Sequence, residues 1–161
     1  MSRLCRVVPF AAIAGLNPDL YIFLGDNISS IQVIPEFSGW ESWSNVPFEK
    51  QRLFDLIANK AIEGVIFISG DRHFAEISVL RREGGYPLYE LTSSALNLRH
   101  PSGQTGYNEF RIDGTYLREN FGEIRIRWST DPLIIMSIRE LEGEVRLETS
   151  FSLADLTSTP P

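Results

Sequence analysis

Two short apolar runs, each followed by the dipeptide Gly-Asp, constrain this chain more than any other feature of its sequence. The first run is Asp19–Leu24, before Gly25 and Asp26, and the second is Gly64–Ser69, before Gly70 and Asp71. Runs without polar alternation are typical of strands that are buried on both faces of a covered sheet. Both dipeptides are therefore predicted to begin loops at the ends of buried strands.

Residues from Pro47 to Ala61 are predicted to form the main helix. Pro47 lies in the first turn, where proline is tolerated, and Glu49 complements the positive end of the helix. Apolar residues recur at helical spacing from Leu53 onward. We expect this apolar face to pack on a sheet.

The remaining predicted strands are short and are flanked by turn residues. They are Ser30–Ile34, Glu76–Arg82, Tyr86–Thr92, Gly122–Trp128, Leu133–Leu141 and Glu144–Phe151. Gly84 and Gly85 predict a hairpin, and polar–apolar alternation in the last three strands predicts an antiparallel meander. Residues 97–120 are predicted to be a long loop, and residues 157–161 a frayed tail. The fold class is therefore α/β, with a mixed sheet, a covering helix and an antiparallel C-terminal end.

The composition favours one soluble globular domain, expected over residues 1–156. The chain has 161 residues, 43% of them hydrophobic and 22% charged, which is enough to bury a core. The net charge of -6 disfavours a general nucleic-acid or membrane-surface binder, because anionic surfaces require an excess of Lys and Arg. No apolar run is long enough to span a bilayer, so no membrane partner is expected.

Cysteine content and the first residues leave the compartment open. Cys5 is the only cysteine, which excludes an intramolecular disulfide and a cysteine-rich zinc site. Arg3 and Arg6 precede an apolar stretch, as in a signal peptide, but Pro9 interrupts it and a short helix is the better interpretation. A cytoplasmic location is the default expectation, and the oligomeric state stays open.

Asp26, Asp71 and His73 are the residues that best suit a chemical role. Ligands of open α/β sheets bind beyond the carboxyl ends of strands, where Asp26 and Asp71 are expected to lie. Carboxylate and imidazole groups suit divalent or trivalent metal ions, so two such loops side by side predict a metal site. The alternative is that each Asp is a turn former or a helix cap, since Asp is common in both places.

Two longer blocks around these residues resemble the PhoD-like (alkaline phosphatase D) family of phosphatases. The blocks are Asn17–Asn27 and Gly64–Ser78. Shorter segments extend the resemblance over nearly the whole chain: Ser29–Val33, Gly39–Trp43, Pro47–Leu53, Tyr86–Ser94 and Asn120–Gly122.

The resemblance implies a calcineurin-like metallophosphoesterase fold, a mixed β-sandwich flanked by helices. It also implies a hydrolase that cleaves a small-molecule phosphate mono- or diester with a metal-activated water. The metal-binding residues would be Asp26, which bridges two metal ions, together with Asp71 and His73. Calcium, iron, manganese and zinc are the candidate ions. Arg72 and Asn27 are candidate substrate-binding residues; alternatively, Arg72 forms a surface salt bridge, and Asn27 orients Asp26 or is a turn residue.

The chain departs from the family by a shortening between Ile28 and Ser29. Family members carry a large segment there with a Trp-Asp-Asp-His-Asp type motif, and this chain has no Asp-Asp-His sequence. Ser29 also stands where the family usually has a Tyr, which is a metal ligand in some members. Part of the expected metal centre is therefore predicted to be missing.

Three interpretations of the shortened chain stay open. It is a phosphatase with a reduced ligand set, a catalytically inactive remnant that serves as a structural or binding module, or an enzyme whose middle segment was lost from the sequence through a gene-model error. Cys5 and His100 stand near family positions around the active site, but a structural thiol and a solvated loop histidine are the preferred interpretations. Trp40 and Trp43 are expected to pack in the core or at its edge.

Overall fold

The computed structural model describes residues 33–35, 42–97 and 105–158. The strand predicted at Asp19–Leu24 lies outside these residues. Of the strand predicted at Ser30–Ile34, only Val33 and Ile34 are described, and they form a bend together with Pro35, so the strand prediction is wrong for these two residues.

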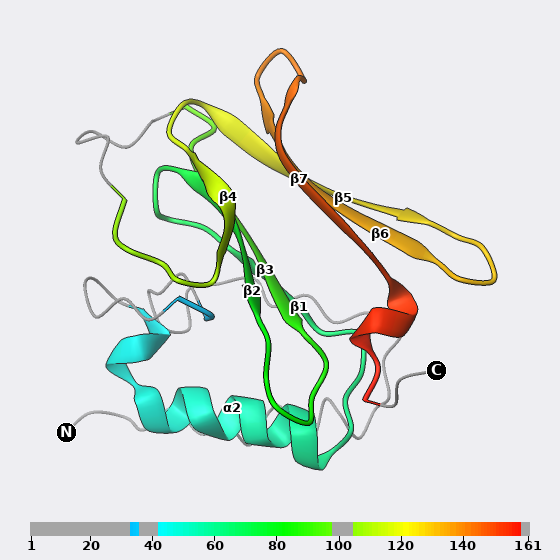
Figure 1. The fold of residues 1–161 in the computed structure, drawn as a ribbon. Coiled ribbons are helices and arrows are strands. Elements are labelled where there is room, and N and C mark those ends of the chain that lie inside the picture. Colours follow the sequence, from blue (N-terminus) through cyan, green and yellow to red (C-terminus); the bar gives the residue numbers. More distant parts are fainter. Residues whose placement is uncertain (1–32, 36–41, 98–104, 159–161) are drawn as a thin grey trace.

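The first described sheet is mixed and contains four strands (Figure 1). The strands are β1 (Ile66–Ser69), β2 (Ala75–Leu80), β3 (Leu88–Ser93) and β4 (Arg111–Tyr116), in the order β1-β3-β2-β4. β1 runs parallel to β3, whereas β2 pairs antiparallel with both β3 and β4. The hairpin predicted around Gly84 and Gly85 is confirmed, because it joins β2 to β3.

β4 corrects the prediction of an unbroken loop over residues 97–120. The register of β4 against β2 shifts between Glu76, which pairs with Thr115, and Ile77, which pairs with Ile112. The residues passed over are Asp113 and Gly114, and Asp113 has a φ of 60°. These two turn formers form a bulge inside the strand. Because turn residues usually mark loops, their presence led to the prediction of a loop.

The second sheet is the predicted antiparallel meander, and the structure confirms it. It consists of β5 (Asn120–Arg127), β6 (Leu133–Glu140) and β7 (Val145–Ser152), in that order. A short 3-10 helix, η2 (Leu153–Leu156), follows β7, and Ser152 caps it by accepting a hydrogen bond from the amide of Asp155. Thr157 also bonds to the carbonyl of Ala154.

The predicted helix is confirmed as α2 (Pro47–Asn59). It ends before the predicted Ala61, because Ala61 has a positive φ of 48°, which takes the backbone out of the right-handed helix. Its buried residues include Leu53, Phe54 and Ile57. The ring of Phe54 lies 6.5 Å from that of Phe67 in β1, so α2 packs on the mixed sheet. A 3-10 helix, η1 (Trp43–Asn45), precedes α2, and Trp43 is buried in the core as expected.

One face of the mixed sheet is apolar and packs on the antiparallel sheet. Leu91 and Ile77 are paired neighbours on this face, and both are buried. Tyr89 also lies on it and stacks on Phe151 of β7, with ring centroids 3.9 Å apart and planes at 11°. The two sheets therefore form a sandwich, with α2 on the outer side of the mixed sheet (Figure 1).

The prediction that β1 is buried on both faces was wrong. Ile68 in this strand is 52% exposed. The physical reason is its position, because β1 is the terminal strand among the described strands of the mixed sheet and pairs there only with β3.

The other face of the mixed sheet, toward α2, carries buried polar side chains. Glu76 and Ser78 in β2 and Glu90 and Thr92 in β3 are at most 1% exposed. Pairing places Ser78 opposite Glu90 and Glu76 opposite Thr92, so all four lie on one face. Buried carboxylates need hydrogen-bond partners, so this face constrains what can pack on it.

Glu90 binds the backbone of the segment around Ile34. Its carboxylate oxygens accept hydrogen bonds from the amides of Val33 at 2.8 Å and Ile34 at 2.7 Å. The ammonium of Lys50 in α2 donates to the carbonyl of Ile34 at 3.1 Å. Burial raises the pKa of Glu90 to about 7, although the two amide hydrogen bonds oppose the rise.

We predict that Glu90 makes the stability of the protein depend on pH. Its pKa is higher in the folded state than the ordinary value of 4.5, so its stabilising contribution is complete below about pH 4.5 and is lost as the pH rises through about 7. Relative to Glu90→Gln, which cannot ionise, the wild type should lose on the order of 3 kcal/mol of unfolding free energy over this range, at ~1.36 kcal/mol per pKa unit. Denaturant unfolding at several pH values measures the difference.

The exposed variant Glu142→Gln is the control, and its unfolding free energy should follow that of the wild type. If the unfolding free energies of the wild type and of Glu90→Gln changed with pH in the same way, the prediction would be contradicted.

Candidate functional site

The loop after β1 carries three of the predicted site residues, Asp71, Arg72 and His73. Asp71 and His73 both have left-handed backbone conformations, with φ of 55° and 57°. Such conformations cost free energy for residues other than glycine and need support from the surroundings. The hydroxyl of Ser94 gives this support, since it accepts hydrogen bonds from the amides of Arg72 at 2.8 Å and His73 at 3.0 Å.

Ser94 reaches this loop because β1 and β3 run parallel. Ser69 at the end of β1 pairs with Thr92 of β3, and their hydroxyls are 2.8 Å apart. Ser94 follows two residues later, beside Gly70. A Cβ built on Gly70 would lie 3.6 Å from the Cβ of Ser94, which is ordinary contact, so the two loops pack closely. The structure thus places the loop at the carboxyl end of the sheet, where it was predicted.

Asp71 and His73 lie together at the surface. Oδ1 of Asp71 is 4.0 Å from Nε2 of His73, and their side chains are 74% and 39% exposed. This separation is too long for a hydrogen bond. It is within twice the typical metal–ligand distance of about 2.1 Å, so one cation is able to contact both atoms. The two donor types suit a metal ion, and at this separation a single cation would contact them at a wide angle.

Within the parts of the chain that the structure describes, no group of three or more His, Cys, Asp or Glu residues is arranged to hold a metal ion. Asp71 and His73 are therefore two candidate ligands in the described residues, fewer than a complete metal site needs. Asp26 and Asn27, predicted to complete the site, lie outside the described residues, as do Cys5 and His100.

Arg72 is half-buried and is held over an aromatic ring. Its guanidinium carbon lies 5.3 Å from the ring centroid of Phe74, within the range of a cation–π contact. Burial lowers the pKa of Arg72, while the negative charges of Glu76 and Asp71 act in the opposite direction. The carboxylates of Asp71 and Glu76 thus offset part of the charge of this half-buried guanidinium.

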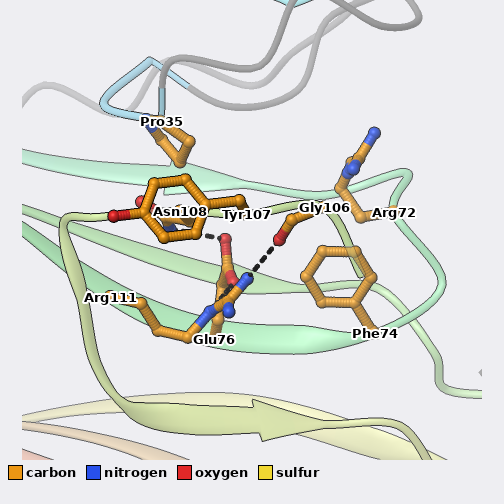
Figure 2. Close-up of a pocket in the computed structure, with 8 residues that line it drawn as sticks. All are labelled: Pro35, Arg72, Phe74, Glu76, Gly106, Tyr107, Asn108 and Arg111. Atoms are coloured by element: carbon orange, nitrogen blue, oxygen red, sulfur yellow. Dashed lines mark hydrogen bonds and ion pairs between the residues drawn. The ribbon is translucent and has the colours of Figure 1, made fainter. Parts of the chain in front are cut away.

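Beside Arg72 lies a small cavity of about 10 Å³, the size of about one water molecule (Figure 2). Eight residues line it: Pro35, Arg72, Phe74, Glu76, Gly106, Tyr107, Asn108 and Arg111. Figure 2 shows Arg111 reaching both Glu76 and the backbone of Gly106. The space is too small for a phosphate ester, and hydrogen bonds join Glu76, Asn108 and Arg111 beside it.

Glu76 is held by two partners from the segment that sequence analysis interpreted as a loop. Nε of Arg111 donates to it at 2.6 Å, and Nδ2 of Asn108 donates at 3.0 Å. Nothing in the sequence identified these partners, because Arg111 begins the bulged strand β4. Ser94 was missed as a support for the site. Identifying Ser94 required the register of β3 against β1, which the sequence does not supply.

Comparison with known protein families, curated proteins and solved structures finds no match to this chain. No helix in the described part of the chain is long and apolar enough to cross a membrane. The structure shows a mixed α/β chain rich in strands, with one mixed and one antiparallel sheet.

We predict that Ser94→Ala loosens the Asp71–His73 loop. Two backbone amides lose their acceptor, which should cost about 1 to 2 kcal/mol of unfolding free energy. Amide hydrogen exchange at Arg72 and His73 should accelerate more than exchange in β6. Ser150→Ala, at an exposed position of β7, is the control and should change neither quantity. Unchanged exchange at Arg72 and His73 in Ser94→Ala would show that the loop does not depend on Ser94.

We also predict that Arg111→Leu is strongly destabilising. It removes the Arg111 guanidinium from Glu76, which is 1% exposed, and loss of one member of a buried ion pair typically costs about 3 to 5 kcal/mol. Arg125→Leu removes an exposed ion pair with Glu123 and should cost less than about 1 kcal/mol. Chemical denaturation compares the two variants, and equal losses would contradict the structural role of Arg111.

Proposed function

We propose that this chain is a metal-dependent hydrolase of phosphate mono- or diesters, related to the PhoD-like phosphatases of the calcineurin-like metallophosphoesterases. The observation that carries the proposal is the approach of Asp71 and His73 to 4.0 Å at the carboxyl end of a parallel pair of strands. A two-sheet sandwich with a helix on the outer side of the mixed sheet is compatible with a shortened metallophosphoesterase fold.

In this proposal the carboxylate of Asp71 and the imidazole of His73 hold the metal ion. A mixed oxygen and nitrogen donor set suits manganese, iron or zinc better than calcium, which prefers oxygen ligands. A metal ion bound in such a site supplies Lewis acidity and lowers the pKa of a bound water.

Arg72 binds the phosphoryl oxygens in the same proposal. It lies between the two metal-binding residues in the sequence, and its cation–π contact with Phe74 orients the guanidinium. Its guanidinium stays charged in proteins and matches the geometry of phosphate. The hydrogen bonds from the amides of Arg72 and His73 to Ser94 hold the loop in one conformation before the ester binds.

The rest of the proposed site comes from residues that the sequence nominates. Asp26 is proposed as a further metal ligand and Asn27 as a group that contacts substrate or orients Asp26. Because the chain is shortened near Ile28 and Ser29, the proposed ligand set is smaller than that of the family. The alternative function is a binding or structural module that keeps the sandwich and lacks hydrolysis.

We predict that Asp71→Asn and His73→Asn each weaken metal binding by at least about tenfold and abolish metal-dependent hydrolysis. Asn tolerates the left-handed backbone of both positions, so the substitutions remove the donor with little strain. Metal stoichiometry after loading with Mn²⁺, Fe²⁺ or Zn²⁺, together with hydrolysis of 1-naphthyl phosphate and of a phosphodiester, measures the effect.

Asp113→Asn is the matched control, because Asp113 is exposed and has the same left-handed backbone, with φ of 60°. It should leave both metal content and turnover unchanged. A wild type that binds no metal and hydrolyses no ester would overturn the proposal and leave the binding or structural module.

A further inference from the structure

A second and much larger hollow lies between the two sheets, beside the Asp71–His73 loop. We call it the intersheet groove, and its volume is about 450 Å³. Five apolar side chains line it: Ile68, Leu91, Leu96, Phe121 and Ile124. A volume of this size lies within the range of small-molecule sites, which are roughly 300 to 1,000 Å³.

Two serines that line the groove adjoin the Asp71–His73 loop, while Asp71, Arg72 and His73 are not among the lining residues. Ser69 and Ser94 line the groove. Ser69 immediately precedes Gly70 and Asp71, and the hydroxyl of Ser94 accepts the amides of Arg72 and His73. A ligand that fills the groove therefore contacts the same residues that hold the Asp71–His73 loop.

The chemistry of the groove favours an uncharged, apolar ligand group. None of the residues lining it is charged. Its polar residues are engaged within the protein, since Ser93 donates to Oδ1 of Asn120 at 2.8 Å and Asn120 donates to the carbonyl of Arg118 at 2.7 Å. The exposed fractions of Ile68 (52%) and Leu96 (65%) show that apolar surface of the groove is open to a ligand.

Gly122 marks a place where β5 lies close to β3 at the edge of the groove. A Cβ at this position would meet Cδ2 of Leu91 at 3.0 Å and Cβ of Ser93 at 3.3 Å, which is tighter than ordinary contact. A glycine here lets β5 approach β3 closely without a side chain entering the space between the sheets.

We propose that the intersheet groove binds the apolar alcohol portion of a phosphate ester, an aryl or alkyl group, while the Asp71–His73 loop holds the phosphoryl group. This inference rests on the proposed function and adds the substrate class to it. Esters of apolar alcohols are then preferred over esters of small polar alcohols, because only the former remove the groove's apolar surface from water.

The test measures binding and turnover separately. Binding of 1-naphthol, which lacks phosphate, is followed by fluorescence and by amide chemical shifts at Ser69, Leu91 and Gly122. Turnover is compared between 2-phenylethyl phosphate and glycerol 2-phosphate, whose leaving alcohols are of similar basicity. We expect 1-naphthol to shift the groove amides and kcat/KM to favour the phenylethyl ester by at least about tenfold, which corresponds to about 1.4 kcal/mol.

Leu96→Asp places a charge in the groove at an exposed position and should weaken 1-naphthol binding by about tenfold or more. Leu141→Asp, at a similarly exposed leucine outside the groove, should leave binding unchanged. Leu96→Ser removes apolar area without adding a charge and gives a second test if the aspartate variant does not fold.

The outcomes separate this inference from the proposed function. If 1-naphthol shifts the groove amides and Leu96→Asp weakens its binding, but no ester is hydrolysed, the groove is a ligand site and only the hydrolase proposal fails. If esters are hydrolysed with equal kcat/KM and 1-naphthol does not shift the groove amides, the groove inference is overturned and the hydrolase proposal stands.

Discussion

The described structure depends on two carboxylates buried in the middle of the mixed sheet. Glu76 and Glu90 are almost completely excluded from water, so each requires donors from other segments. Arg111 and Asn108 donate to Glu76, and the amides of Val33 and Ile34 donate to Glu90. These interactions connect segments far apart in the sequence. The face under α2 is consequently a hydrogen-bonded layer, whereas the face toward the antiparallel sheet is packed by apolar contact.

The candidate site follows from the parallel pairing of β1 with β3. Because both strands end at the same edge of the sheet, Ser94 after β3 meets the amides of Arg72 and His73 after β1. This contact holds a loop with two left-handed residues in one conformation and leaves Asp71 and His73 exposed beside each other. The same pairing forms one side of the intersheet groove, so the proposed metal site and the proposed apolar subsite share one scaffold. A change at Ser94 should therefore affect both.

Local sequence patterns were sufficient to predict the elements for which local propensity and tertiary packing favour the same structure. The helical spacing of apolar residues predicted α2, and Gly84 with Gly85 predicted the β2–β3 hairpin, because each signal depends on neighbouring residues alone. β4 was missed, because Asp113 and Gly114 carry turn propensity but sit in a bulge that pairing with β2 stabilises. β1 was predicted to be fully buried, but burial depends on which strands lie beside it. Asp26 and Asn27 remain predictions.

Short-range patterns were enough to predict the α/β class, the order of most elements and the position of Asp71 and His73 after an apolar strand, because periodicity and turn residues act over short distances. They also identified Arg72 as a neighbour of the site. The 4.0 Å approach of Asp71 to His73, the support from Ser94 and the pairing of Glu76 with Arg111 come from the tertiary structure. The contacts of Ser94 and Arg111 join residues that are distant in the chain, so they depend on strand register and on the packing of the sheets. Register is set by the burial of one whole face of each strand, which no short segment of sequence specifies.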